Sequence, residues 1–199
     1  MKKDWKANSK SQYVTLGASD HSNKEREEND FYATSDIAVR LLLDSESFNP
    51  FVWECACGTG HISKVLEDYM YTVKSTDIID RGYGEGCVDF LSCDIKYWHG
   101  DIITNPPYSL AHEFVEKALS IVNQGSKVAM FLRLLFLEGQ KRRKLFHANP
   151  PKRVYVFSKR AYCAKNGDFS IQNEGGAVAY AWFVWEKGYK NDSIIKWIN

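Results

Sequence analysis

The amino-acid sequence predicts an α/β protein with a mostly parallel, doubly wound sheet and an antiparallel terminal strand. Three observations support this fold class. Short apolar segments alternate with segments of helical periodicity, as expected when helices cover both faces of a parallel sheet. A glycine-rich turn at residues 54–60 joins the first strand to a helix. The last two apolar segments are joined by residues 158–176, which are too polar and glycine-containing for a crossover helix and so permit an antiparallel pair at the sheet edge.

Each element follows from a local pattern. Short apolar runs between polar turns predict the strands, at residues 51–56, 72–77, 101–104, 127–135, 153–157 and 177–185. Apolar residues three and four positions apart predict the helices, at residues 35–44, 61–70, 111–122 and 140–147. Thr34 and Ser35 precede the first helix, where hydroxyl side chains commonly form a cap. A further short strand is expected at residues 87–88.

We expect one domain, residues 29–199, preceded by a mobile N-terminal arm, residues 1–28. The arm is rich in Lys, Asn, Ser, Asp and Glu with few apolar anchors, so it could order on a partner. The chain starts without an apolar signal segment, and its longest apolar run, residues 128–137, is too short to span a membrane and includes Arg133. We therefore expect a cytoplasmic protein with no membrane partner. The five cysteines lack CxxC spacing, which argues against a disulfide framework or a metal site.

Positive charge is concentrated in one part of the sequence, although the formal net charge is only +1. No acidic residue lies between Glu138 and Asp168. The basic residues in that interval are Lys141, Arg142, Arg143, Lys144, Lys152, Arg153, Lys159, Arg160 and Lys165. This distribution is typical of a surface that binds nucleic acid, although a solvated helix face followed by a charged loop has the same pattern.

The glycine-rich turn reads Glu-Cys-Ala-Cys-Gly-Thr-Gly at residues 54–60. Ligands of open α/β sheets bind where strands end beside a helix N-terminus, which is the expected position of this turn. Gly58 and Gly60 would let the backbone approach a cofactor closely. Asp77 ends the second predicted strand, where its carboxylate could accept both hydroxyls of a ribose. The turn by itself is also compatible with nucleotide binding or with a merely tight connection.

Residues 105–108, Asn-Pro-Pro-Tyr, follow another strand and carry the most specific chemistry. An exocyclic amino group on a heteroaromatic ring is a poor nucleophile, because its lone pair is delocalised into the ring. If the Asn105 side-chain oxygen and the Pro106 carbonyl accept its two hydrogens, the nitrogen can aim its lone pair at the transferred group. Pro106 and Pro107 hold that carbonyl rigidly, and Tyr108 offers a face for a planar base. A rigid turn after a strand is the alternative.

Both motifs resemble those of S-adenosylmethionine-dependent methyltransferases. Residues 54–60 are similar to motif I, written (Asp/Glu)-x-(Ala/Phe)-x-Gly-x-Gly, while Ser63 departs from the Gly or Ala of a dinucleotide fingerprint. Residues 105–108 are similar to motif IV of amino methyltransferases, whose adenine-N6 members carry Asp or Asn first and whose cytosine-N4 members usually carry Ser. The resemblance implies a Rossmann-like class I methyltransferase fold, S-adenosyl-L-methionine as cofactor, and methyl transfer to an exocyclic amino nitrogen, adenine N6 in DNA.

Two further segments extend this resemblance. Residues 29–35 resemble the segment before motif I of DNA adenine methyltransferases, where a Thr at the helix start, here Thr34, meets the cofactor carboxylate. Residues 88–91 resemble motif III, whose acidic residue binds the cofactor adenine. Asp89 holds that place, and Asp94 is the competing carboxylate. The cofactor-binding residues implied by the resemblance are Thr34, Glu54, Ala56, Gly58, Gly60, Asp77, Ile78, Asp89 and Phe90.

The resemblance covers about residues 29–186, and residues 177–188 are similar to the last strand of small phage- and prophage-type DNA methyltransferases. No appended target-recognition domain is evident, so recognition is expected to depend on loops, the arm or a partner subunit. The residues predicted to bind DNA and the flipped base are Lys159, Arg160, Tyr162, Lys165 and Phe169. The alternatives are an RNA or protein-glutamine N-methyltransferase with the same tetrad, or a non-catalytic subunit that binds the cofactor.

Overall fold

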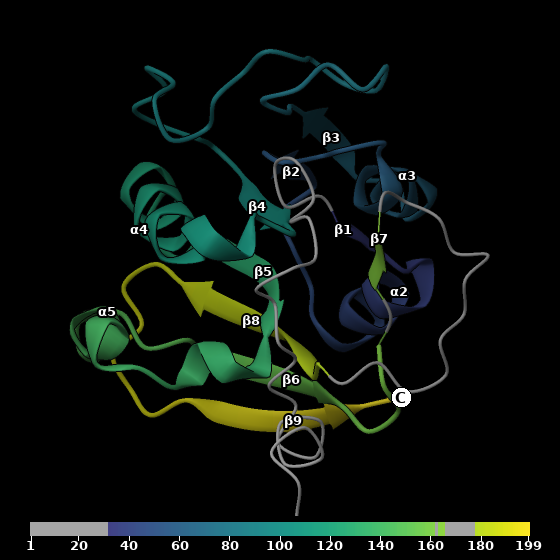
Figure 1. The fold of residues 1–199 in the computed structure, drawn as a ribbon. Coiled ribbons are helices and arrows are strands. Elements are labelled where there is room, and N and C mark those ends of the chain that lie inside the picture. The colour runs from purple at the N-terminus through teal and green to yellow at the C-terminus, as the bar shows by residue number, and fades with distance from the viewer. Residues whose placement is uncertain (1–31, 162, 166–177) are drawn as a thin grey trace, which may run out of the picture.

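The computed structural model describes residues 32–161, 163–165 and 178–199, which form a seven-stranded sheet flanked by helices (Figure 1). In spatial order the strands are β3 (Thr72–Ser75), β2 (Phe51–Glu54), β4 (Asp101–Thr104), β5 (Lys127–Arg133), β8 (Tyr180–Glu186), β6 (Arg153–Phe157) and β9 (Ile194–Ile198). The α-helices are α2 (Asp36–Ser45), α3 (His61–Asp68), α4 (Ala111–Ile121) and α5 (Arg143–Ala148). The predicted arm, residues 1–28, lies outside the described residues.

The sheet is mostly parallel, as predicted. β3, β2, β4 and β5 pair in parallel, and β8 enters antiparallel between β5 and β6. The expected antiparallel pair is therefore confirmed, but it does not form the sheet edge, because β9 pairs in parallel with the outer side of β6. β9 was not predicted. Four of its five residues are exposed, so its sequence lacks the alternation of apolar and polar residues that indicates a strand.

Three predicted local features differ from the structure. Residues 87–88 form no strand, because Cys87 has a φ of 61°, which is incompatible with extended backbone. The segment contributes one hydrogen bond, from the Val88 amide to the Asp77 carbonyl. Helix α2 begins after Ser35, as expected, but the Ser35 side chain makes no cap hydrogen bond. The predicted helix at 140–147 is a 3-10 turn, η5 (Gln140–Arg142), followed by α5.

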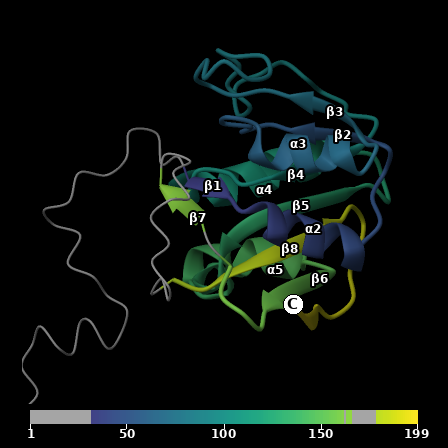
Figure 2. The ribbon, with the colours of Figure 1, turned by 90° about the vertical axis from the view of Figure 1, so that its right-hand side faces the viewer.

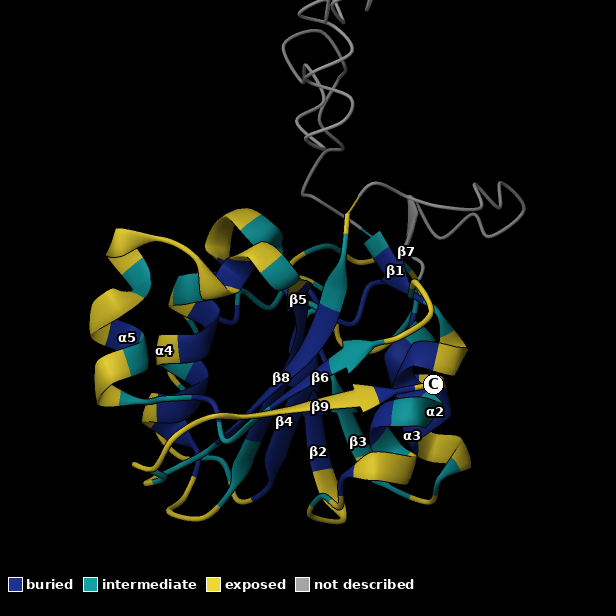
Figure 3. Ribbon diagram, turned by 90° about the horizontal axis from the view of Figure 1, so that it is seen from below, coloured by how far each residue is buried: buried dark blue, intermediate teal, exposed yellow. Residues whose placement is uncertain are grey.

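Strand side chains alternate between two cores, one on each face of the sheet. Trp53, Ile102, Met130 and Phe183 pack with α4 and α5. Val52, Ile103, Phe131 and Trp182 pack with α2 and α3. Figure 3 shows the two helix pairs on opposite sides of the buried strands. Because both faces are covered, the middle residues of the central strands are apolar on both sides, which is why short apolar runs predicted these strands.

The short strand β1 (Tyr32–Thr34) pairs antiparallel with β7 (Cys163–Lys165) and stands apart from the main sheet (Figure 2). β1 lies beside the carboxyl end of β4, although the two strands are far apart in sequence. The Asn105 side chain, which follows β4, donates a hydrogen bond to the Tyr32 carbonyl of β1. The chain after β6 thus returns through β7 to β1, beside the carboxyl end of β4. No helix among the described residues is long and apolar enough to cross a membrane.

Candidate functional site

A cavity of about 800 Å³ lies where β2, β4 and β5 end. Its volume falls within the range of small-molecule and cofactor sites. The predicted site residues that line it are Thr34, Glu54, Ala56, Asp77, Ile78, Asp89, Phe90, Asn105, Pro107 and Tyr108. Parallel strands place their carboxyl ends at the same edge, so the two sequence motifs converge although 44 positions separate Gly60 from Thr104. The strands that carry the two motifs, β2 and β4, are neighbours in the sheet and pair in parallel.

Several predicted site residues do not reach this cavity. Gly58, Gly60 and Pro106 are absent from its lining. Lys159 and Arg160 are exposed and also do not line it, because β5 and β8 separate β6 from β4. The carboxyl end of β6 therefore does not lie beside that of β4, where Asn105 follows. Tyr162, Phe169 and the side chain of Lys165 lie outside the described residues.

Asn105 is held in one orientation by β1. Its Nδ2 donates to the Tyr32 carbonyl oxygen at 2.7 Å and to the Thr34 hydroxyl at 3.0 Å. The opposite end of the amide, Oδ1, is buried and accepts no hydrogen bond from any described residue. A buried acceptor without a partner is unfavourable by about 1 to 3 kcal/mol and is uncommon in folded proteins. The arrangement leaves an oriented acceptor on a cavity-lining side chain.

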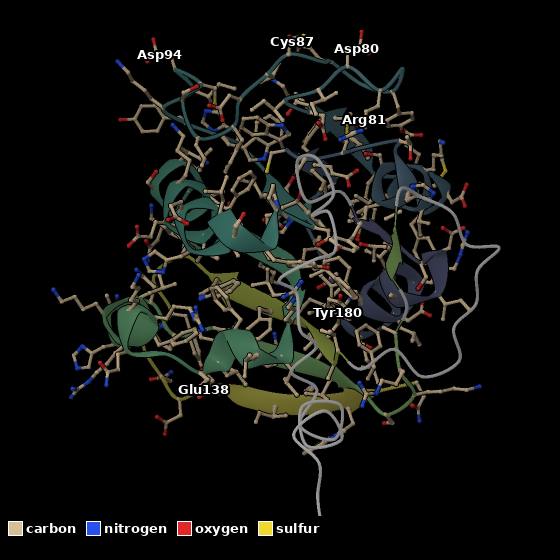
Figure 4. The ribbon with its side chains drawn as sticks, viewed as in Figure 1. Asp80, Arg81, Cys87, Asp94, Glu138 and Tyr180 are labelled. Atoms are coloured by element: carbon tan, nitrogen blue, oxygen red, sulfur yellow. The ribbon has the colours of Figure 1, made fainter. Side chains whose placement is uncertain are left out.

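Tyr108 lies in a group of aromatic rings beside Asn105. Its ring centroid is 5.7 Å from those of Tyr32 and Tyr180, with interplanar angles of 33° and 35°. The Arg133 guanidinium carbon lies 4.8 Å from the Tyr108 ring centroid, in a cation–π contact. Figure 4 shows Tyr180 at the centre of the view, near the start of β8. A planar ligand therefore meets an aromatic wall, one ring of which already carries a guanidinium.

Glu54 is a buried carboxyl group whose principal partner is a serine. The Ser63 hydroxyl donates to Glu54 Oε2 and lies 2.7 Å from the Ser75 hydroxyl. Burial, with smaller contributions from the negative charges of Asp77 and Glu67, raises the pKa of Glu54 to about 8, against the hydrogen bonding from Ser63, which lowers it. Ser63, the residue that departs from a dinucleotide fingerprint, is thus the hydrogen-bond donor to the buried Glu54 carboxyl group.

Asp77 stabilises the glycine-rich turn from the next strand. Its Oδ2 accepts from the Gly58 amide at 2.8 Å, and its Oδ1 accepts from the Ile79 amide at 2.9 Å. Each carboxylate oxygen keeps a lone pair for a further donor, such as a ribose hydroxyl. The Gly58 amide, by contrast, is already committed to Asp77.

Of the two candidate motif III carboxylates, only Asp89 lines the cavity. It accepts from the Leu91 amide and the Ser92 hydroxyl. Asp94 is exposed and points away from the centre of the molecule (Figure 4). Phe90 is 1% exposed and packs edge-on against Trp53 at 5.2 Å, so it belongs to the core as well as to the cavity wall.

Gly60 is required for a reason other than cofactor approach. Its φ is 82°, and a Cβ placed there would lie 2.4 Å from the Tyr83 ring. Gly82 has a similar φ of 77° but nothing within 4 Å of the corresponding Cβ position. Both glycines therefore have a left-handed backbone that disfavours other residues, but only at Gly60 would a side chain also collide with a neighbour.

We expect Gly60→Ala to destabilise the protein more than Gly82→Ala. The left-handed backbone alone should lower the free energy of unfolding by about 1 to 2 kcal/mol in each variant. The clash with Tyr83 should add about 1 to 3 kcal/mol for Gly60 only. Urea denaturation of both variants measures the difference, and equal losses would refute the steric explanation.

The cavity is also lined by ionisable residues that sequence reasoning did not assign to the site, His61, Arg133 and Arg142 among them. His61 is the first residue of α3, and burial, with a smaller contribution from Lys64, lowers its pKa. Arg133 ends β5, and Arg142 lies in η5. The rule that ligands bind at strand ends could have identified Arg133. His61 had a comparable signal, its place at a helix N-terminus directly after the glycine-rich turn.

The sequence matches no protein-family model and no curated protein sequence. The structure, however, is similar to solved structures. A "putative RNA methyltransferase" from Pyrococcus horikoshii aligns with a TM-score of 0.54 at 12% identity, covering 89% of this chain and 97% of that one. A type I restriction-modification methyltransferase subunit from Streptococcus thermophilus aligns with a TM-score of 0.62 at 11% identity, covering 84% of this chain and 47% of that one.

A "putative class I S-adenosylmethionine-dependent methyltransferase" from Listeria monocytogenes aligns over 94% of this chain and 70% of its own, with a TM-score of 0.57 at 12% identity. At such identities the similarity establishes the fold. This chain therefore has the Rossmann-like fold of class I methyltransferases.

Proposed function

We propose that this protein transfers a methyl group from S-adenosylmethionine to an exocyclic amino nitrogen, namely N6 of adenine in DNA. The observation that carries the proposal is the Asn105 side chain. Its Nδ2 is bound to Tyr32 and Thr34, and its Oδ1 is a buried acceptor without a partner. An amino group bears two hydrogens, so one of them satisfies this acceptor. The second is assigned to the Pro106 carbonyl, which would have to turn toward the cavity, because Pro106 does not line it in this structure.

The residues present fit the cofactor. Asp77 and Asp89 bring two carboxyl groups to the cavity, which suits hydroxyl and amino donors of an adenosine. The Thr34 hydroxyl lies at the start of α2, where a carboxylate is favoured. Asp77 would hold the ribose, Asp89 the adenine amino group, and Thr34 the methionine carboxylate. Bound there, S-adenosylmethionine would supply a methyl group, whose bond to sulfur breaks as the bond to the target nitrogen forms; S-adenosylhomocysteine is left, and the nitrogen releases one proton to solvent.

The protein's own contribution is alignment of the target nitrogen. Asn105 Oδ1 accepts one amino hydrogen and thereby turns the nitrogen lone pair away from the ring plane. Pro106 and Pro107 limit movement of the backbone carbonyl that accepts the second hydrogen. Tyr108 would support the base from one side, and Phe90 and Phe136 contribute apolar surface to the cavity wall.

A nucleic-acid target is proposed on the basis of charge, and DNA in particular on the resemblance of residues 29–35 and 105–108 to DNA adenine methyltransferases. Lys141, Arg143 and Lys144 are exposed on η5 and α5. Lys152 and Arg153 are less available, because they form ion pairs with Glu186 at 2.5 Å and Glu46 at 2.7 Å. The exposed cations could neutralise phosphates while a flipped adenine enters the cavity. A partner subunit that recognises the target sequence is compatible with this arrangement.

Replacing Asp77 by Ala should weaken cofactor binding. The substitution removes the proposed ribose contacts and frees the Gly58 amide, so we expect a loss of about 1.5 to 3 kcal/mol in calorimetric titration with S-adenosylmethionine. Asp80→Ala is the matched control, because Asp80 also accepts a loop amide, from Gly82, but does not line the cavity. Equal losses in the two variants would contradict a direct contact between Asp77 and the cofactor.

The proposed function is tested by methyl transfer in parallel. The purified protein is incubated with S-[methyl-³H]adenosylmethionine and DNA, RNA or a protein extract, and labelled nucleic acid is digested to nucleosides. We expect the label in DNA, and we expect digestion to release it as N6-methyl-2′-deoxyadenosine. Label confined to RNA or to protein glutamine would replace DNA as the substrate, and cofactor binding without transfer to any of the three would indicate a non-catalytic subunit.

A further inference from the structure

Arg133 occupies a distinctive position in the cavity. It is the last residue of β5, its side chain is exposed, and its guanidinium lies over the Tyr108 ring. In the register of β4 with β5, Thr104 pairs with Met130. Asn105 is one residue past Thr104, whereas Arg133 is three residues past Met130. Arg133 therefore lies two residues further along the strand direction than Asn105, roughly 7 Å nearer the cavity mouth. A group held by Asn105 would therefore lie deeper than one held by Arg133.

The charge of Arg133 is not balanced locally. No carboxylate of a described residue lies within salt-bridge distance of it. Arg142 lines the same side of the cavity, but its guanidinium donates to the carbonyl oxygens of Phe136 at 2.7 Å and of Leu135 at 3.3 Å. It is therefore a fixed positive charge, whereas Arg133 is held only by the ring of Tyr108 among the contacts described.

The charged residues that line the cavity are unevenly distributed. Asp77, Arg81 and Asp89 belong to the segment that follows β3, where two carboxylates suit a sulfonium cofactor. Arg133 and Arg142 lie on the side of β5, beyond Asn105. An anion is favoured on this second side. A nucleotide supplies one at its phosphate, whereas a glutamine side chain is neutral along its whole length.

We propose that Arg133 binds a backbone phosphate of the target nucleotide when the base enters, and thereby selects nucleotide over amide targets. This inference rests on the proposed methylation of a base. The base needs the Tyr108 face that Arg133 now occupies, and Asn105 Oδ1 becomes accessible only after a neighbouring group shifts, because it is buried. Moving the guanidinium from the ring to a phosphate uncovers the face and replaces a cation–π contact by a charge-assisted, bidentate hydrogen bond.

The test compares two arginine–tyrosine contacts in the same protein. Arg133→Gln removes the guanidinium from Tyr108. Arg40→Gln removes another guanidinium, which lies 5.7 Å from the Tyr69 ring centroid and outside the cavity. Both variants lose one positive charge. Binding of a fluorescent single-stranded oligonucleotide of mixed sequence is measured against salt at saturating S-adenosylhomocysteine, and methylation kinetics are measured on DNA.

We expect Arg133→Gln to reduce the slope of log affinity against log salt by about 0.7, the value for one lost phosphate contact on a single strand, and Arg40→Gln to leave it unchanged. Arg133→Gln should also raise KM for DNA at least tenfold, and Arg133→Lys should restore part of that loss. Unchanged slope and KM in Arg133→Gln would overturn the inference. If the unmodified protein labels DNA in that case, the proposed function still stands, whereas failure to label any nucleic acid would overturn both.

Discussion

Asn105→Ala is expected to abolish methyl transfer, lowering kcat at least 1,000-fold, or about 4 kcal/mol of transition-state stabilisation. The substitution removes the oriented Oδ1 that aligns the target nitrogen, and nothing among the described residues occupies an equivalent position. Single-turnover transfer from tritiated cofactor measures the chemical step directly. A loss of only two- or threefold would mean that Asn105 does not contact the target.

Two further variants separate alignment from structural support. Asn105→Ala also removes the hydrogen bonds to Tyr32 and Thr34, so β1 and the proposed cofactor contact at Thr34 could be disturbed. Asn105→Asp keeps the side-chain shape but cannot donate to the Tyr32 carbonyl. Asn123→Ala, which removes an exposed amide beside His99, is the control outside the cavity. We expect cofactor affinity to change less than threefold in Asn105→Ala, and a large loss would assign Asn105 to cofactor binding instead.

Glu54→Gln is expected to stabilise the protein at alkaline pH and to change little in acid. The pKa of Glu54 is raised to about 8 in the folded protein from an ordinary value of 4.5. Between these pH values the folded state binds more protons at Glu54 than the unfolded state, so the free energy of unfolding falls as pH rises through this interval. Glutamine does not titrate and removes this dependence.

The difference between the two proteins should reach about 2 to 4 kcal/mol near pH 8 and vanish near pH 4.5. Chemical denaturation of both proteins at intervals across this range measures it. Glu113→Gln controls for the loss of a glutamate at an exposed position of α4. A constant difference between Glu54→Gln and the unmodified protein across the whole range would show that Glu54 does not retain its proton when buried.

Much of the fold could be predicted because its signals are local. β4 and β6 begin and end at the predicted residues, and α2, α3 and α4 differ from prediction by one or two positions at their ends. These elements have apolar faces of the correct period or fully buried runs. β9 was not predicted because its sequence is mostly exposed, and residues 87–88 were predicted as a strand because apolar character alone does not report a positive φ.

The site was predictable in part for a similar reason. The motif residues converge because parallel strands end at one edge, a property of the fold class. Gly60, however, is constrained by Tyr83, and Glu54 by Ser63, which are contacts between side chains rather than properties of either motif. The predicted DNA-binding residues Lys159 and Arg160 follow a strand that two others separate from β4, and no local pattern specifies the order of strands in a sheet.

The sequence by itself determined the α/β class, most of the elements and the rigid Asn-Pro-Pro-Tyr turn, because periodicity and proline act within a few residues. Only the tertiary structure decided which end of the Asn105 amide is available and which cation covers Tyr108. Asn105 is oriented by residues 71 and 73 positions away, and Arg133 meets Tyr108 from another strand. Such contacts depend on which strands are neighbours and in what register, and that arrangement is set by the packing of the whole sheet rather than by any single segment.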